Sequence, residues 1–67
     1  MAKYMAEYWN SEHGLLMVYR FDAIDRQKAI QIAGAENVPD TTTINLYSFT
    51  KDYCPIFETN LLTEHDT

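Results

Sequence analysis

The sequence predicts a small α+β protein in which an antiparallel sheet carries one helix packed on one face. Two pairs of segments are rich in aromatic and β-branched residues and alternate with a period of two. A single segment between the pairs has a helical spacing of apolar residues. The expected order of elements is therefore β-β-α-β-β, and a chain of 67 residues predicts a single domain over 1–67.

The first two strands are expected to form a hairpin. In Lys3–Trp9 the residues Tyr4, Ala6 and Tyr8 would share one face of a strand. Residues 10–14, Asn-Ser-Glu-His-Gly, have turn chemistry, and the glycine can adopt a positive φ. The segment 15–21 is the clearest strand. One face of this strand would carry Leu15, Met17, Tyr19 and Phe21, and the other face would carry Leu16, Val18 and Arg20.

The helix is expected from Ala23 to about Ala35. Asp22 is the predicted N-cap, and Asp25 would lie in the first turn, where the helix dipole favours negative charge. The apolar side is made of small and β-branched residues, which allow close packing on a sheet: Ala29, Ile30, Ile32 and Ala33. Gly34, Asn37 and Pro39 are signals for its end.

The second hairpin is expected to join 43–50 to 53–58 through a turn at 51–52. Ile44 and Leu46 would point to one face of the third strand, and Asn45, Tyr47 and Phe49 to the other. Pro55 cannot donate a ladder hydrogen bond, which predicts an edge position for the fourth strand. The acidic segment 59–67 has no periodicity and is expected to fray.

Composition restricts the classes of function. Hydrophobic residues make up 46% and aromatic residues 13%, which is typical of a packed chain rather than a disordered one. The net charge of −5, from ten acidic and five basic residues, disfavours direct binding to nucleic acid or to anionic membranes. It suits a protein partner with a basic surface, although net acidity also serves solubility alone. A single cysteine and no signal-peptide pattern indicate a cytoplasmic protein.

The residues that carry chemistry do not form a recognisable set. His13, His65 and Cys54 have no further His or Cys at the spacing of a metal site, so neither a metal nor another cofactor is expected. Gly14 and Gly34 are isolated, which excludes a glycine-rich phosphate loop. We therefore predict that the protein is not an enzyme.

The surplus of aromatic residues is the most informative feature. One helix of about thirteen residues spans roughly 20 Å and covers one sheet face, whereas large rings are expected on both faces. An exposed aromatic patch is typical of an interface, although tyrosine also tolerates a half-exposed strand. We predict a regulator or inhibitor that occupies a basic, nucleic-acid-binding surface of a protein partner. The candidate contact residues are the acidic Glu7, Glu12, Asp52 and Glu58 and the aromatic Tyr8, Trp9 and Tyr47.

The profile of size, charge and aromatic content is similar to that of small phage-encoded inhibitors, anti-CRISPR proteins among them. Those proteins are commonly short and acidic and act by occupying a protein surface. The resemblance involves no motif and transfers no site residues. Two alternatives stay open: a homo-oligomer, such as a homodimer, that buries one sheet face against its copy, and a small enzyme or ligand sensor built around Cys54 or a histidine at a subunit boundary.

Overall fold

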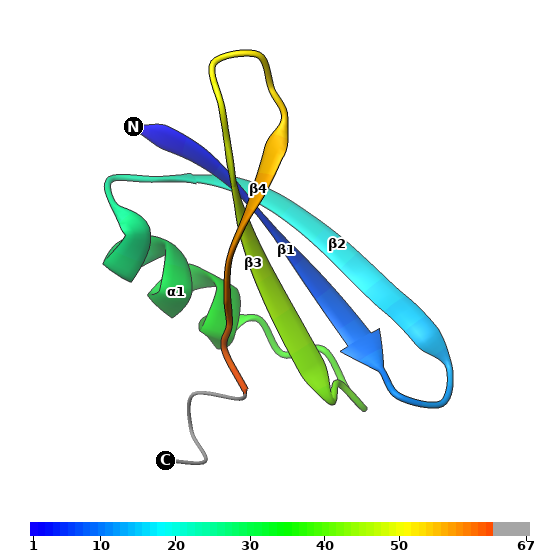
Figure 1. Cartoon of the computed structure of the whole chain (residues 1–67). Coiled ribbons are helices and arrows are strands. Elements are labelled where there is room, and N and C mark those ends of the chain that lie inside the picture. The colour runs from blue at the N-terminus through cyan, green and yellow to red at the C-terminus, as the bar shows by residue number, and fades with distance from the viewer. Residues whose placement is uncertain (63–67) are drawn as a thin grey trace.

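The computed structural model describes residues 1–62 and shows four strands and one helix (Figure 1). The elements in chain order are β1 (Ala2–Asn10), β2 (Gly14–Ala23), α1 (Arg26–Ala35), β3 (Thr43–Phe49) and β4 (Pro55–Asn60). All neighbouring strands pair antiparallel, in the spatial order β2-β1-β3-β4. The predicted α+β class is confirmed, with the elements in the expected order and with shifted bounds. In the described part, no helix has the length and apolar character needed to cross a membrane.

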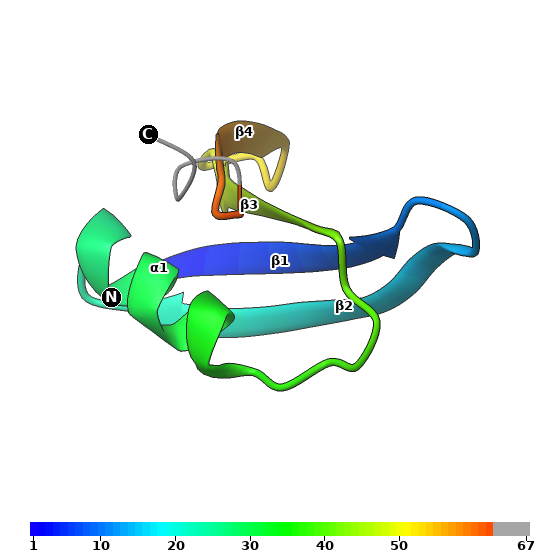
Figure 2. The same cartoon turned by 90° about the horizontal axis from the view of Figure 1, so that it is seen from below.

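The position of the helix follows from where strand pairing stops. Figure 2 shows α1 on one side of the sheet, and its backbone comes closest to β2 and β3. The prediction that Asp22 caps the helix is wrong, because Asp22 still belongs to β2 and pairs with Lys3 in the ladder. Asp25 is the N-cap instead. Its backbone is extended (φ −156°, ψ 178°), and its carboxylate accepts a hydrogen bond from the Lys28 amide at 2.8 Å.

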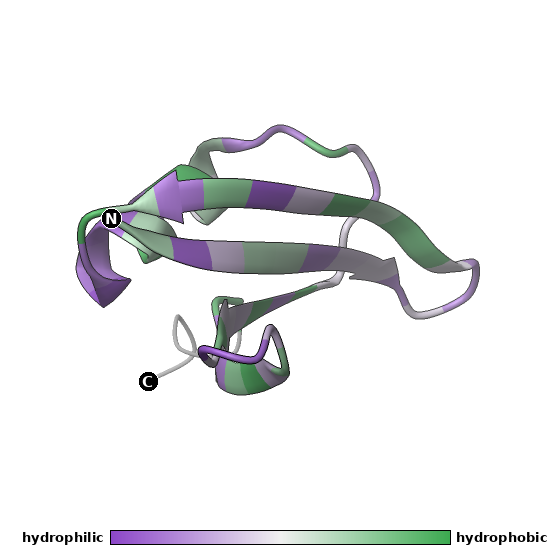
Figure 3. Ribbon diagram, turned by 90° about the horizontal axis from the view of Figure 1, so that it is seen from above, coloured by the Kyte–Doolittle hydropathy of each residue, from purple (hydrophilic) through white to green (hydrophobic). Residues whose placement is uncertain are grey.

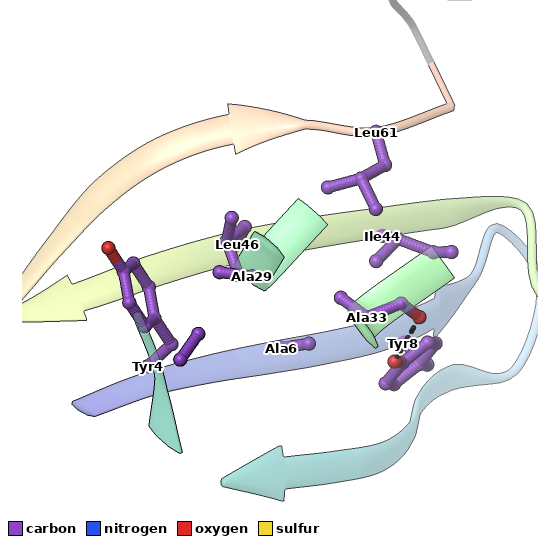
Figure 4. Close-up of a cluster of buried hydrophobic side chains, with 9 residues drawn as sticks. Tyr4, Ala6, Tyr8, Ala29, Ala33, Ile44, Leu46 and Leu61 are labelled. Atoms are coloured by element: carbon purple, nitrogen blue, oxygen red, sulfur yellow. Dashed lines mark hydrogen bonds between the residues drawn. The ribbon is translucent and has the colours of Figure 1, made fainter. Parts of the chain in front are cut away.

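The core lies between α1 and one face of the sheet (Figure 4). β1 contributes the set that was predicted to share one face, and Ala6 stands between Tyr19 of β2 and Leu46 of β3 in the register. Alanines on both elements let the helix backbone approach the sheet closely. The buried hydrophobic residues are Tyr4, Ala6, Tyr8, Ala23, Ala29, Ala33, Ile44, Leu46 and Leu61.

Two bulges alter the predicted alternation. On the β1–β2 pair, Tyr8 faces Met17 while Trp9 faces Leu15, so Leu16 is an extra residue. Leu15 therefore shares a face with Trp9, and its predicted place beside Met17 is wrong. On the β3–β4 pair, Leu46 faces Thr59 while Tyr47 faces Phe57. The extra residue on this pair is Glu58, between Phe57 and Thr59.

The end of the described chain is part of the fold. β4 begins at Pro55 rather than Tyr53 and continues to Asn60. Thr59 and Leu61 are buried, and the Leu61 amide donates to the Ile44 carbonyl at 2.9 Å. Residues 59–62, which were predicted to belong to a fraying tail, are thus held against the core. The remainder of that predicted tail, 63–67, lies outside the described residues.

Candidate functional site

The sheet face opposite α1 is not covered by the helix, and we call it the open face. In the register, Met5 stands between Arg20 and Tyr47, and Tyr47 stands beside Phe57. In Figure 3, hydrophilic and hydrophobic bands alternate along β1 and β2, as expected for strands with two different faces. The central side chains of the open face are Met5, Glu7, Trp9, Val18, Arg20, Asn45, Tyr47 and Phe57.

A carboxylate flanked by two aromatic residues forms the centre of the open face. The indole Nε1 of Trp9 donates to Oε1 of Glu7 at 3.1 Å. Burial raises the pKa of Tyr47, and hydrogen bonding to Glu7 and the negative charge of Glu7 raise it further. All three side chains are half-buried. The indole donor holds the carboxylate in place and leaves part of its acceptor capacity for a further donor.

Apolar side chains around this centre are exposed to solvent. Phe57 is 56% exposed and lies edge-to-face against Tyr47, with ring centroids 5.7 Å apart. At the opposite edge of the same face, on β2, Val18 is 42% exposed and Leu15 is 47% exposed. Aromatic and aliphatic groups that are gathered on one exposed sheet face are typical of a protein interface.

Three of the seven predicted contact residues come together, and four do not. Glu7, Trp9 and Tyr47 form the centre of the open face. Glu12 lies in the β1–β2 turn and Asp52 in the β3–β4 turn, at opposite ends of the sheet. Glu58 is bound by the Ser48 hydroxyl at 2.5 Å and by the Arg26 guanidinium at 3.3 Å.

The prediction that Tyr8 is an exposed anchor is wrong. Its side chain is fully buried, and its hydroxyl donates to the Ala33 carbonyl at 2.6 Å (Figure 4). The physical reason is the period of two, because Tyr8 shares the inward face with Tyr4 and Ala6. Burial, with a smaller effect from the negative charge of Glu36, raises the pKa of Tyr8 to about 12.

Cys54 and His13, two of the residues of the enzyme or sensor hypothesis, are apart within one chain. Cys54 is exposed beside the β3–β4 turn, whereas His13 is exposed in the β1–β2 turn at the other end of the sheet. His65 lies outside the described residues. Among residues 1–62, no group of three or more His, Cys, Asp and Glu side chains is arranged to hold a metal ion.

A second feature, which sequence reasoning missed, is a hollow of about 580 Å³ at the end of the sheet that carries the β3–β4 turn. We call it the terminal hollow. It depends on how the two hairpins separate in space, and no sequence pattern encodes that separation. Its lining residues are Lys3, Tyr4, Arg20, Phe21, Asp22, Phe49 and Tyr53.

Comparison with known proteins gives no relative: no family model, no curated protein and no solved structure matches this chain.

Proposed function

We propose that this protein is a small regulator that binds a partner protein through the open face. The observation that carries the proposal is the preorganised Glu7–Trp9–Tyr47 centre within a rim of exposed apolar side chains. Trp and Tyr are over-represented among the residues that dominate binding energy, and rings that are already held lose little entropy on binding.

The partner that fits this centre presents a basic side chain. A guanidinium that approaches Glu7 would pair with a carboxylate and meet the Trp9 ring, which combines a charge-assisted hydrogen bond with a cation–π contact. Exposed Glu12 and Asp52, at the two ends of the sheet, add long-range attraction for a basic surface. The net charge of −5 acts in the same direction.

An inhibitory role follows where the basic surface of the partner is its nucleic-acid-binding surface. A bound acidic protein would then occupy positions that phosphates otherwise take. Occupying a protein surface is the mode of action of the phage-encoded, anti-CRISPR-like inhibitors that the chain resembles in size, charge and aromatic content. The direct measurement is whether added protein releases nucleic acid from the captured partner.

The experiment is affinity capture from the native host at low and at high salt, with wild type, Glu7→Gln and the matched control Glu36→Gln. Each variant removes one negative charge, but Glu36 lies at the end of α1, away from the open face. We expect a basic partner whose capture falls at high salt and falls at least tenfold in Glu7→Gln, with little change in Glu36→Gln. The proposal would be contradicted if the amount of captured partner did not change with salt and was equal in both variants.

Self-association is the second candidate, and the exposed edge strand β2 favours it. The edge strand β2 is ten residues long and pairs only with β1; it contains no proline and exposes Leu15, Leu16 and Val18. The other edge, β4, begins with Pro55 and is interrupted by a bulge, both of which discourage pairing with another strand. β2 is therefore the edge at which a second copy would extend the sheet.

Sedimentation over a dilution series tests this second candidate. We expect a dimer that dissociates on dilution, and a lysine on the open edge, Val18→Lys, should give a monomer. Phe57→Lys places the same charge on the protected edge and serves as the control. A wild-type protein that is monomeric at every concentration would dismiss self-association.

A further inference from the structure

We propose that the terminal hollow binds a small anion that carries a flat aromatic ring, with the size and charge of a mononucleotide. The proposal is independent of the protein-binding function, because it depends on a cavity at one end of the sheet and not on the Glu7 centre. Four observations support it: the origin of the hollow, the rings in its walls, the balance of charge around it and the exposed ring at its rim.

The hollow exists because the two hairpins separate. Pairing between β1 and β3 ends at Tyr4 and Ser48. The β1–β2 ladder continues to Ala2 and Ala23, and the β3–β4 ladder continues to Phe49 and Pro55. Figure 1 shows the β3–β4 turn standing away from the β1–β2 pair at this end. The resulting volume of about 580 Å³ lies within the usual range for small-molecule sites, about 300–1,000 Å³.

Aromatic side chains form much of the wall. Tyr4 and Phe21 are neighbours across β1 and β2, stacked with ring centroids 6.1 Å apart and planes inclined by 18°. Phe49 comes from the end of β3 and Tyr53 from the β3–β4 turn. Rings on two sides of one hollow suit a planar ligand, because aromatic groups stack on the faces of heterocycles.

The charge around the hollow is opposite in sign to that of the chain. Lys3 and Arg20 line it together with one acid, Asp22, which gives a formal local charge of +1 in a chain of charge −5. Lys3 is paired with Asp22 at 3.7 Å. Arg20 makes no ion pair within residues 1–62, so its guanidinium has donors for a bidentate contact to a phosphate or carboxylate.

Tyr53 stands at the rim of the hollow with an exposed ring. Its φ is 63°, in the left-handed region, and the residue is 70% exposed. The β3–β4 turn accounts for this conformation through hydrogen bonds from the Tyr53 amide to the Thr50 carbonyl at 3.0 Å and from the Cys54 amide to Thr50 Oγ1 at 3.1 Å. The turn thus leaves the Tyr53 ring beside the hollow, where it can stack on a planar ligand.

The test is an amide NMR titration of the isotope-labelled full chain with four probes: AMP, adenosine, inorganic phosphate and 4-hydroxyphenylacetate. AMP and the aromatic carboxylate each combine a ring with an anion, and they distinguish a nucleotide from an aromatic acid as the natural ligand. We expect saturable shifts at Lys3, Arg20 and Tyr53 with at least one of these two. Adenosine, which has only the ring, and phosphate, which is only an anion, should bind at least tenfold more weakly.

Four variants connect the binding to the hollow. Arg20→Gln should weaken binding at least tenfold, because a hydrogen bond between charged groups is lost, while Lys28→Gln on the exposed surface of α1 should change nothing. Tyr53→Ala should weaken binding and Tyr53→Phe should preserve it, since the ring is the part that acts. The amide spectrum of each variant reports that it is folded. The proposal is overturned if neither ring-bearing anion gives saturable shifts, or if Arg20→Gln and Lys28→Gln bind alike.

Discussion

Replacement of Tyr8 by phenylalanine tests how the helix is fastened to the sheet. Ala33 is one of the last four residues of α1, whose carbonyls have no partner within the helix. The Tyr8 hydroxyl supplies the missing donor from β1, at 2.6 Å and fully buried. Tyr8→Phe keeps the ring in the core and removes only this donor.

The expected loss at neutral pH is about 1–3 kcal/mol, the cost of leaving a buried carbonyl without its hydrogen bond. A chain of this length has a free energy of unfolding of about 3–10 kcal/mol, so the loss is a large fraction of the total. Each kcal/mol lowers the thermal midpoint of a domain this small by roughly 4–8 °C. Tyr53→Phe, which removes an exposed hydroxyl, is the control and should leave the midpoint unchanged.

The same hydroxyl makes stability depend on alkaline pH. The pKa of Tyr8 is raised from 10.0 in the unfolded chain to about 12 in the fold. The stabilisation of the fold by the protonated Tyr8 hydroxyl is therefore complete below about pH 10. It is lost between pH 10 and 12, because Tyr8 releases its proton at lower pH in the unfolded chain than in the folded one. At pH 11 the loss amounts to about 1.4 kcal/mol. Urea unfolding from pH 8 to 11 should show the gap between wild type and Tyr8→Phe narrowing by that amount.

Two results would refute this reasoning. One is a Tyr8→Phe variant as stable as wild type at neutral pH, which would mean that the Ala33 carbonyl does not depend on Tyr8. The other is a stability gap that stays constant from pH 8 to 11. The raised pKa of Tyr47 affects both proteins equally and cancels in the comparison.

Four further substitutions test the helix and the end of the chain by thermal unfolding. Asp25→Ala should cost about 1 kcal/mol, whereas Asp22→Ala should cost less than about 0.5 kcal/mol; equal losses would contradict the capping role of Asp25. Gly34→Ala should stabilise by about 0.5–1 kcal/mol, since the new Cβ would lie 3.6 Å from a Leu61 methyl in ordinary contact; a loss would show that the site has no room. Leu61→Ala should cost about 2–5 kcal/mol as a buried truncation, and a neutral result would show that residues 59–62 are not held against the core.

Alternation along the strands was sufficient to predict the fold class and most of the residues that share a face. Lys3 and Glu7 stand on one face of β1, while Tyr4, Ala6 and Tyr8 stand on the other, and a charged face is seldom the buried one. Tyr8 lies on the uncharged face, so the period of two predicts its buried environment better than its aromatic character does. Period decides which residues share a face, and the charged residues then indicate which face is covered.

The pattern does not say how far a ladder extends or where a bulge enters. Asp22 is a residue type that favours the N-cap position, but the β1–β2 ladder continues to Ala2 and Ala23. The helix therefore begins three residues later than predicted, at Arg26. The bulge at Leu16 turns Leu15 outward. Both outcomes depend on the partner strand, which a single segment of sequence does not contain. The terminal hollow is still harder to predict from the sequence, because it depends on where two strand ladders end relative to each other.

Arg20 links the two surfaces proposed for this protein. It is the cross-strand neighbour of Met5 on the open face, and it also lines the terminal hollow. An anion bound in the hollow would neutralise a positive charge beside the Glu7 centre and would make the open face more attractive to a basic partner. Linkage requires the reverse as well: a basic partner on the open face must favour anion binding by the same factor. Saturating anion should therefore change the partner affinity of wild type and leave the partner affinity of Arg20→Gln unchanged. The affinity of Arg20→Gln for the partner should equal that of wild type with anion bound. An anion effect that persists in Arg20→Gln would show that the coupling does not pass through this side chain.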